Sequence, residues 1–185
     1  IFTEPRDIKG TATLTHSKIE PDDNDQWIYL PAIKRVKRIS SSNRTGKFVG
    51  SEFSFEDLAS QEIENNTYLW LEDLVCPNTI ELKCSMIEAR PKNKKSGYSK
   101  VINYIYLKEF RVQFAQFYNR RGDLEKELSY LDYKKYLNKY WFFHGLVMLN
   151  KQTGKSTELK WDEYKVQSGL KMSDFDPKKL PKMAK

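Results

Sequence analysis

Ser51, Asp57 and the two histidines, His16 and His144, are the residues whose types could combine in nucleophilic catalysis. A serine nucleophile needs a histidine base, and that base needs a carboxylate to orient it. Ser51, however, follows a Phe-Val-Gly sequence, which is not the Gly-x-Ser-x-Gly turn that exposes the nucleophile of α/β-hydrolases. We therefore expect no catalytic residues and no enzymatic activity, and we keep a lipid-cleaving enzyme as an alternative.

Metal ligands are equally scarce. The acidic run at positions 22–25 could supply oxygen ligands for calcium, but an EF-hand loop starting there would need Gly where the chain has Trp27. Cys76 and Cys84 lack a nearby histidine and the spacing of zinc ligands. We expect no metal and no cofactor. The two cysteines flank a Pro-Asn-Thr turn signal, so they form either a disulfide across a hairpin or two half-buried thiols, depending on the redox compartment.

Basic residues give the chain a formal net charge of +7, which favours anionic partners. The densest basic stretch is a short predicted strand, in which alternation places Arg35 and Lys37 on one face and Lys34, Val36 and Arg38 on the other. Such a strand can be a solvated edge that resists pairing. It can also contact lipid phosphates or an acidic protein surface.

The elements that position these residues are mainly strands. With 39% hydrophobic and 14% aromatic residues in 185, the chain can bury a real core, and it has no run of about 18 apolar residues that would span a membrane. Short strand patterns follow one another at intervals of about 10–15 residues, which predicts one strongly curved antiparallel sheet. The expected strands are centred near Trp27, Val36, Tyr68, Ile87, Ile102, Phe114, Phe143 and Leu159. Positions 124–136 fit helix or strand, and positions 53–63 are the main helical candidate.

Many of these strands are apolar on both faces, so one face needs a helix layer or a ligand to cover it. Aromatic residues are concentrated at Trp27, Tyr29, Phe48, Phe53, Phe55, Tyr68 and Trp70. They suit a plain core, and they also suit a cavity for acyl chains, where burial yields about 0.8 kcal/mol per CH₂. Gly50, between two of the phenylalanines, predicts a backbone bend or a close approach, so Gly50→Val should cost about 1–3 kcal/mol.

Two motifs stand close together in this region: W-x-Y-L-P-A at 27–32 and F-x-G-S-x-F-x-x-E-D-L at 48–58. Together they resemble the signature of the periplasmic LolA-like outer-membrane lipoprotein-sorting family. Weaker matches at 8–12, 89–92, 98–101 and 150–157 extend the resemblance over most of the chain. The resemblance implies a mainly β (α+β) fold, an unclosed β-barrel with a few covering helices, and it favours strand at 124–136. It also implies that residues 1–185 form one LolA-like domain without the N-terminal strand and helix region of the family.

The function that the resemblance implies is a non-enzymatic periplasmic carrier or sensor for lipid or lipoprotein acyl chains. It would serve outer-membrane lipoprotein sorting or an efflux-type transporter, with peripheral membrane contact and membrane anchoring left open. The expected cavity residues are Trp27, Tyr29, Val36, Phe48, Phe53 and Trp70. The expected contacts to headgroups or a partner protein are Lys34, Arg35, Lys37 and Arg38. A nucleic-acid-binding β-barrel is a further alternative because of the charge and the aromatic residues, but no nucleic-acid motif is present and we expect no such partner.

Overall fold

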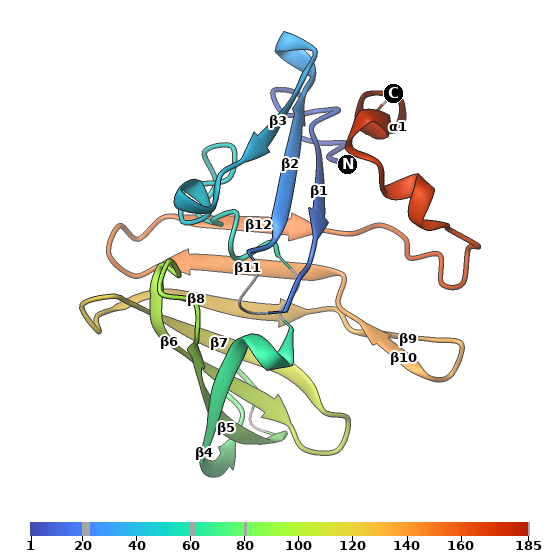
Figure 1. The fold of residues 1–185 in the computed structure, drawn as a ribbon. Coiled ribbons are helices and arrows are strands. Elements are labelled where there is room, and N and C mark those ends of the chain that lie inside the picture. Colours follow the sequence, from blue (N-terminus) through green and yellow to red (C-terminus); the bar gives the residue numbers. More distant parts are fainter. Residues whose placement is uncertain (20–22, 60–61, 80, 185) are drawn as a thin grey trace.

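A computed structural model describes residues 1–19, 23–59, 62–79 and 81–184. Strands hold 45% of the residues and helices 11%, so the predicted mainly β class is confirmed. Most of the strand residues belong to one large antiparallel sheet, above which stands a smaller sheet (Figure 1).

The large sheet has seven strands in the order β12-β11-β8-β7-β6-β5-β4. Their bounds are β4 Asn66–Val75, β5 Lys83–Pro91, β6 Tyr98–Tyr106, β7 Arg111–Asn119, β8 Leu124–Leu131, β11 Gly145–Asn150 and β12 Ser156–Lys160. Each pair is antiparallel, and the strand direction turns progressively from β12 to β4 (Figure 1). The two end strands, β12 and β4, do not pair with each other, so the sheet does not close into a barrel, as expected.

The strands around Trp27 and Val36 do not belong to this sheet, which corrects the prediction of a single sheet. They are β2 (Asp25–Leu30) and β3 (Arg35–Ile39), and they form a separate sheet with β1 (Ala12–His16) in the order β1-β2-β3. Pro31 ends β2 and starts the 3-10 turn η1 (Pro31–Ile33). Lys34 then takes a positive φ of 50°, so β3 folds back onto β2 in a tight hairpin.

The third sheet is a small hairpin of β9 (Lys134–Tyr136) and β10 (Tyr140–Phe142). It accounts for two differences from the sequence analysis. Positions 124–136 are strand, as the resemblance favoured, but Asp132 adopts a φ of 54° and divides them into β8 and β9. The strand expected around Phe143 is also divided, since Phe143 lies between β10 and β11.

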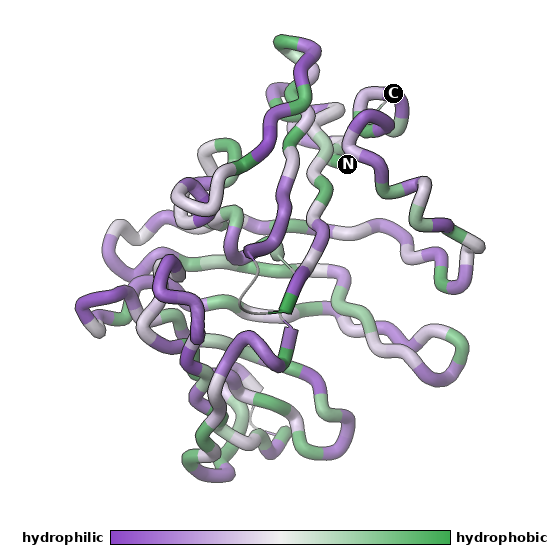
Figure 2. Tube along the Cα trace, in the orientation of Figure 1, coloured by the Kyte–Doolittle hydropathy of each residue, from purple (hydrophilic) through white to green (hydrophobic). Residues whose placement is uncertain are grey.

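The main core lies between the two larger sheets. Cross-strand registers place Val101, Ala115, Phe117, Leu128 and Met148 on one face of the large sheet, which we call the inner face. Two groups of residues cover it: Ile28, Leu30 and Ile39 of the small sheet, and Phe48 and Phe53 from the irregular segment that follows. Figure 2 shows green, hydrophobic stretches in the strands of the large sheet and purple, hydrophilic stretches in most connecting loops.

A second core cluster packs around the disulfide between Cys76 and Cys84, which joins the ends of β4 and β5. Ile102, Tyr104 and Phe114 complete this cluster. Of the two alternatives that the sequence left open, the structure therefore has the disulfide.

Helices are short. Besides η1 they are η2 Ser41–Asn43, η3 Ile63–Asn65, η4 Met172–Phe175, η5 Pro177–Lys179 and α1 Leu180–Met183. The helix expected at 53–63 is wrong for the described positions 53–59, and positions 60 and 61 lie outside the described residues. At positions 54–57 the chain forms a turn in place of a helix. Asp57 Oδ2 accepts from the Ser54 N–H, and Ser54 Oγ accepts from the Asp57 N–H. None of the helices in the described ranges is long and apolar enough to cross a membrane.

Candidate functional site

The covering segment, which we define as residues 44–58, carries the second sequence motif and lies against the inner face. At its centre is a tight turn in which the Ser51 N–H donates to the Phe48 carbonyl at 2.8 Å. Val49 and Gly50 have φ values of 40° and 79°, as in a type I′ turn. A Cβ added to Gly50 would meet nothing within 4 Å. The predicted bend at Gly50 is therefore confirmed, and the predicted close approach is wrong.

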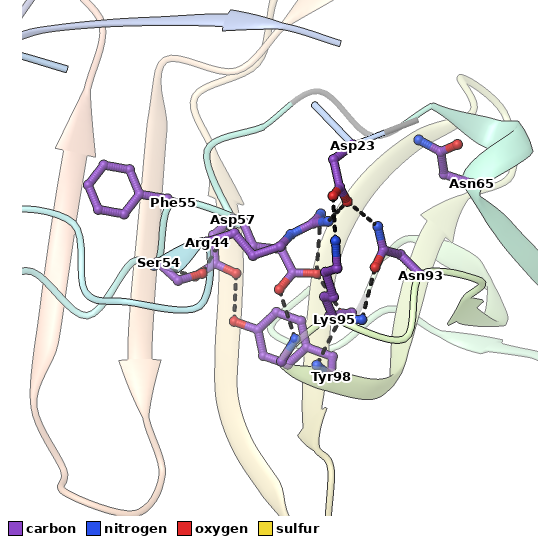
Figure 3. Close-up of polar contacts among 12 residues, drawn as sticks. Asp23, Arg44, Ser54, Phe55, Asp57, Asn65, Asn93, Lys95 and Tyr98 are labelled. Carbon is purple, nitrogen blue, oxygen red and sulfur yellow. Dashed lines mark hydrogen bonds and ion pairs between the residues drawn. The ribbon is translucent and has the colours of Figure 1, made fainter. Parts of the chain in front are cut away.

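A buried polar cluster fixes the end of the covering segment (Figure 3). The Tyr98 hydroxyl donates to Asp57 Oδ1 at 2.6 Å, and Lys126 Nζ donates to Asp57 Oδ2 at 3.1 Å and to the Tyr98 oxygen at 3.0 Å. The side chains of Asp57 and Lys126 are only 1% and 8% exposed. Burial, followed by the nearby Asp57 carboxylate, raises the pKa of Tyr98 well above its ordinary value, so the phenol stays neutral and donates its proton.

Glu56 makes a parallel attachment to the loop before β6. Its carboxylate accepts from the Ser96 hydroxyl at 2.5 Å and from the Gly97 N–H at 2.9 Å, and it lies 3.7 Å from the Arg44 guanidinium. A Cβ on Gly97 would stand 3.0 Å from the Thr45 methyl carbon, so a side chain here would require Thr45 to shift.

Glu52 attaches the middle of the segment to the large sheet. Its buried carboxylate accepts from Asn150 Nδ2 at 2.8 Å and pairs with Lys47 at 2.7 Å, while its backbone N–H donates to Thr157 Oγ1. Burial raises the pKa of Glu52, but the hydrogen bonds from Lys47 and Asn150 outweigh that effect and leave the pKa below its usual value. Apart from an isolated bridge between Lys47 and Ser54, the described part of the segment is held by side chains and turns and not by strand pairing.

The six residues predicted to line an acyl cavity do not surround one space. Phe48 and Phe53 are each 1% exposed and lie in the core. Trp27, Tyr29 and Val36 point away from that core, on the outer face of the small sheet, because they alternate with core-facing residues. Their contact with a ligand stays a prediction.

Trp70 occupies a different position, on the inner face but beyond its cover. The cross-strand register connects it to the core through one residue on each successive strand: Ile87, Asn103, Ala115 and Leu128. Yet the Trp70 residue is 59% exposed on the edge strand β4. Tyr68, two residues earlier on the same face, is 48% exposed. We call Tyr68 and Trp70 the aromatic shelf.

Three clefts flank the covering segment. A narrow one of about 80 Å³ runs between the segment and the inner face, where Ala89, Val101 and Phe117 form its apolar side. A groove of about 650 Å³ lies between the N-terminal residues and β12, with Phe2 and Trp161 among its lining residues. The largest, about 720 Å³, is polar and basic.

The four predicted basic contact residues are all exposed on the β2–β3 hairpin, which projects away from the large sheet (Figure 1). In the strand itself the predicted alternation is confirmed, since Arg35 and Lys37 are register partners of Leu30 and Ile28. Lys34 departs from the prediction because it occupies the turn and not the strand. Arg38 pairs with Asp25.

The candidate catalytic residues are engaged separately. His144 Nδ1 lies 2.7 Å from the Trp161 carbonyl and its Nε2 lies 2.8 Å from the Tyr136 hydroxyl. His16 Nε2 lies 2.8 Å from the Phe175 carbonyl, and Ser51 Oγ contacts the backbone of Phe53. Ser51 and Asp57 therefore bond neither histidine.

Within the described residues, no group of three or more His, Cys, Asp or Glu is placed to hold a metal ion. Asp22, part of the acidic run considered for calcium, lies outside the described residues.

The sequence analysis gave no role to Glu52, Glu56 or Lys126. Glu56 and Asp57 belong to the E-D-L end of the motif, and that was the available signal. Their partners in the large sheet and its loops stand 40 to 69 positions away, where no local pattern marks them.

Comparison with known proteins adds a family context to this geometry. A family model described as "Uncharacterized protein" matches residues 1–182, and no curated protein gives a significant match. A solved domain from Vibrio parahaemolyticus, assigned to outer membrane lipoprotein sorting, is 45% identical with a TM-score of 0.90, and the match covers 98% of this chain and 75% of that chain.

Two further solved structures share the fold. A DUF1329 family protein from Desulfovibrio piger is 25% identical with a TM-score of 0.88, and the match covers 97% of this chain and 75% of that one. A LolA superfamily protein from Nitrosomonas europaea is 19% identical with a TM-score of 0.70, over 94% of this chain and 73% of that one.

Proposed function

Because the chain belongs to the LolA-like outer membrane lipoprotein-sorting family, we propose that it is a non-enzymatic carrier or sensor for lipid or lipoprotein acyl chains. The observation that carries the proposal is the aromatic shelf. Tyr68 and Trp70 continue the apolar inner face beyond its cover, on a sheet whose two edges remain open. Exposed aromatic surface that is continuous with a core is a common feature of ligand-binding surfaces.

An acyl chain on the shelf would have a direct path inward. Ala89, the register partner of Tyr68, also lines the narrow cleft under the covering segment together with Val101 and Phe117. At about 80 Å³ that cleft holds only a short part of a chain. A longer chain would be admitted if the covering segment moved outward, and Phe48 and Phe53 would then contact it.

The way the covering segment is attached supports such a movement. Its carboxylates, Glu52, Glu56 and Asp57, bond to the large sheet and its loops. Its backbone bonds, such as that from the Phe48 N–H to the Phe53 carbonyl, run within the segment itself. Separating it would break these contacts and would withdraw Phe48 and Phe53 from the core, but it would leave the strand pairing of both sheets intact. Burial of an acyl chain, at about 0.8 kcal/mol per CH₂, could offset that cost.

We place the protein in the periplasm, in agreement with its disulfide between two buried cysteines. We propose that the basic β2–β3 hairpin contacts anionic headgroups or a membrane-protein partner such as an efflux-type transporter. Trp27, Tyr29 and Val36 lie on the outer face of the small sheet. Any contact that they make with a ligand would therefore be separate from the acyl path that starts at the aromatic shelf.

The test is binding of a fluorescent fatty-acyl probe to the protein and to two variants of β4. Trp70→Glu removes shelf surface, and Leu69→Glu is its matched control because Leu69 is 58% exposed on the opposite face of the same strand. We expect Trp70→Glu to weaken probe binding about tenfold, since burying a large apolar side chain contributes about 1.5–3 kcal/mol. Leu69→Glu should leave binding unchanged.

Equal loss in both variants, or no binding of the probe by the unaltered protein, rejects the carrier proposal. Phe53→Asp, the change that the sequence suggested, is a poorer test. Phe53 is in the core, so the change should unfold the protein and cannot separate binding from folding.

A further inference from the structure

Three polar loops outside the proposed acyl path meet around the largest cleft. They are residues 40–46, with the sequence Ser-Ser-Ser-Asn-Arg-Thr-Gly, residues 92–97 before β6, and residues 119–123 between β7 and β8. The cleft has a volume of about 720 Å³. Its lining residues are Ser41, Ser42, Thr45, Ser54, Glu56, Lys94, Lys95, Gly97, Tyr98, Asn119, Arg120, Arg121, Glu125 and Lys126.

The Arg120 side chain is held in place by uncharged groups. Its Nε donates to the Ser96 carbonyl at 2.8 Å and its terminal NH2 donates to the Lys94 carbonyl at 3.2 Å. Both partners are neutral backbone groups, and no carboxylate among the described residues neutralises the guanidinium. A guanidinium has five N–H donors, and those left over remain for a ligand in the cleft. An arginine fixed in this way suits planar, bidentate recognition of phosphate.

Lys126 and a row of hydroxyl groups supply further donors. The buried Lys126 ammonium has three protons, of which Asp57 and Tyr98 accept two, and the residue also lines the cleft. Ser41, Ser42 and Thr45 lie across the cleft in the 40–46 loop. Hydroxyl groups and fixed cations together are a typical lining for a phosphate site.

The charge balance also favours an anion. Lys94 is exposed, and its ammonium forms no hydrogen bond or ion pair within the described residues. Of the two carboxylates in the lining, Glu56 is already engaged by Arg44, Ser96 and Gly97. Glu125 has no ion-pair partner in the described part of the chain. Lys94 and Arg120 therefore outweigh the single free carboxylate.

We propose that this cleft binds a phosphate group, presented either by a soluble phosphate compound or by the headgroup of a lipid. The proposal does not rest on the acyl-carrier function, because the cleft and its donors lie outside the acyl path. The Tyr98 side of the cleft nevertheless borders the narrow cleft under the covering segment, so one lipid could reach both.

The experiment is calorimetric titration of the intact protein with inorganic phosphate, and separately with monomeric short-chain phosphatidylglycerol. We expect Lys94→Gln and Arg120→Gln each to weaken binding about tenfold, as for loss of a charge-assisted hydrogen bond. Glu125→Gln should strengthen binding about two- to fivefold, since it removes a like charge. Lys108→Gln is the charge-matched control. Lys108 is exposed at the opposite end of β6 from Lys94 and should have no effect.

The gain in Glu125→Gln separates a real site from a structural effect, because damage to the fold would not tighten binding. Lys94→Gln keeps the test decisive if Arg120→Gln does not fold, since the Lys94 side chain holds no other group. Tighter binding of the short-chain lipid than of inorganic phosphate identifies a lipid headgroup, and the reverse order identifies a soluble phosphate compound. No binding of either probe, or equal weakening by Lys108→Gln, overturns the proposal.

Discussion

Tyr98 and Asp57, 41 positions apart, share a 2.6 Å hydrogen bond that joins the covering segment to the first residue of β6. Lys126, from β8, bonds to both. The E-D-L end of the motif is therefore tied to two strands of the large sheet at a single buried point. Because all three side chains are buried, the contribution of this cluster to stability can be measured by removing one member at a time.

Asp57→Asn should destabilise the protein by about 3–5 kcal/mol, because it leaves the buried Lys126 ammonium without its counter-charge. Tyr98→Phe should cost less, about 1–3 kcal/mol, because it removes the hydrogen bonds of the hydroxyl to Asp57 and Lys126 but leaves no unpaired charge. Urea unfolding measures both. Adding Lys126→Met to Asp57→Asn should recover part of the loss, since the unpaired charge is then gone.

The exposed ion pair of Arg121 and Asp123 provides the control for this prediction. Asp123→Asn should change stability by no more than about 0.5 kcal/mol. Strict additivity of Asp57→Asn and Lys126→Met would show that the two side chains are not coupled in the folded protein.

Alkaline pH should destabilise the fold through its buried tyrosines. Burial, and then Asp57, raises the pKa of Tyr98 well above 10.0 and that of Tyr130 to about 12. In the unfolded chain both phenols lose their protons near pH 10.0, so above that pH the unfolded state binds fewer protons and is favoured. Stability from these groups is fully present below pH 10.0 and is lost as pH rises toward the folded-state pKa values.

The measurement is the free energy of unfolding between neutral pH and about pH 11. Tyr98→Phe should lower stability at neutral pH but reduce the slope above pH 10.0. An unchanged slope in Tyr98→Phe would mean that Tyr98 does not carry the effect.

Gly50→Val should cost about 1–3 kcal/mol, for a reason narrower than the sequence suggested. Gly50 has a φ of 79°, and its missing side chain would have met nothing within 4 Å. The penalty therefore comes from the backbone conformation alone. Gly50→Asn should cost clearly less, because Asn tolerates positive φ. Equal losses of thermal stability in the two variants would contradict this explanation.

The disulfide between Cys76 and Cys84 should stabilise the protein by about 2–3 kcal/mol, as expected for a loop closed over a sequence separation of 8. Urea unfolding with and without reductant measures the effect. The double variant Cys76→Ala with Cys84→Ala should match the reduced protein and should not respond to reductant. A response of the double variant to reductant would show that the reductant acts elsewhere.

Sequence patterns predicted strands because alternation is a local property, visible at β1 or β12 without any partner. They did not place β2 and β3 in their own sheet, since the apolar run from Trp27 to Leu30 looks the same whichever sheet the strand joins. Nor did they separate Phe53, in the core, from Trp70, on the open edge, because both are simply large apolar residues. The pairing of Asp57 with Lys126 across 69 positions depends on the folded chain alone.

The last prediction concerns the β2–β3 hairpin as a membrane contact. Within the described residues, Arg35 and Lys37 form no ion pair, whereas Arg38 pairs with Asp25. Near an anionic surface each free basic residue contributes about 1 kcal/mol. Arg35→Gln with Lys37→Gln should therefore weaken binding to phosphatidylglycerol vesicles about tenfold or more in sedimentation assays. The paired variant Lys108→Gln with Lys171→Gln removes the same charge from exposed positions outside the hairpin and should have little effect. Equal weakening by the two double variants would mean that net charge, and not the hairpin, drives the contact.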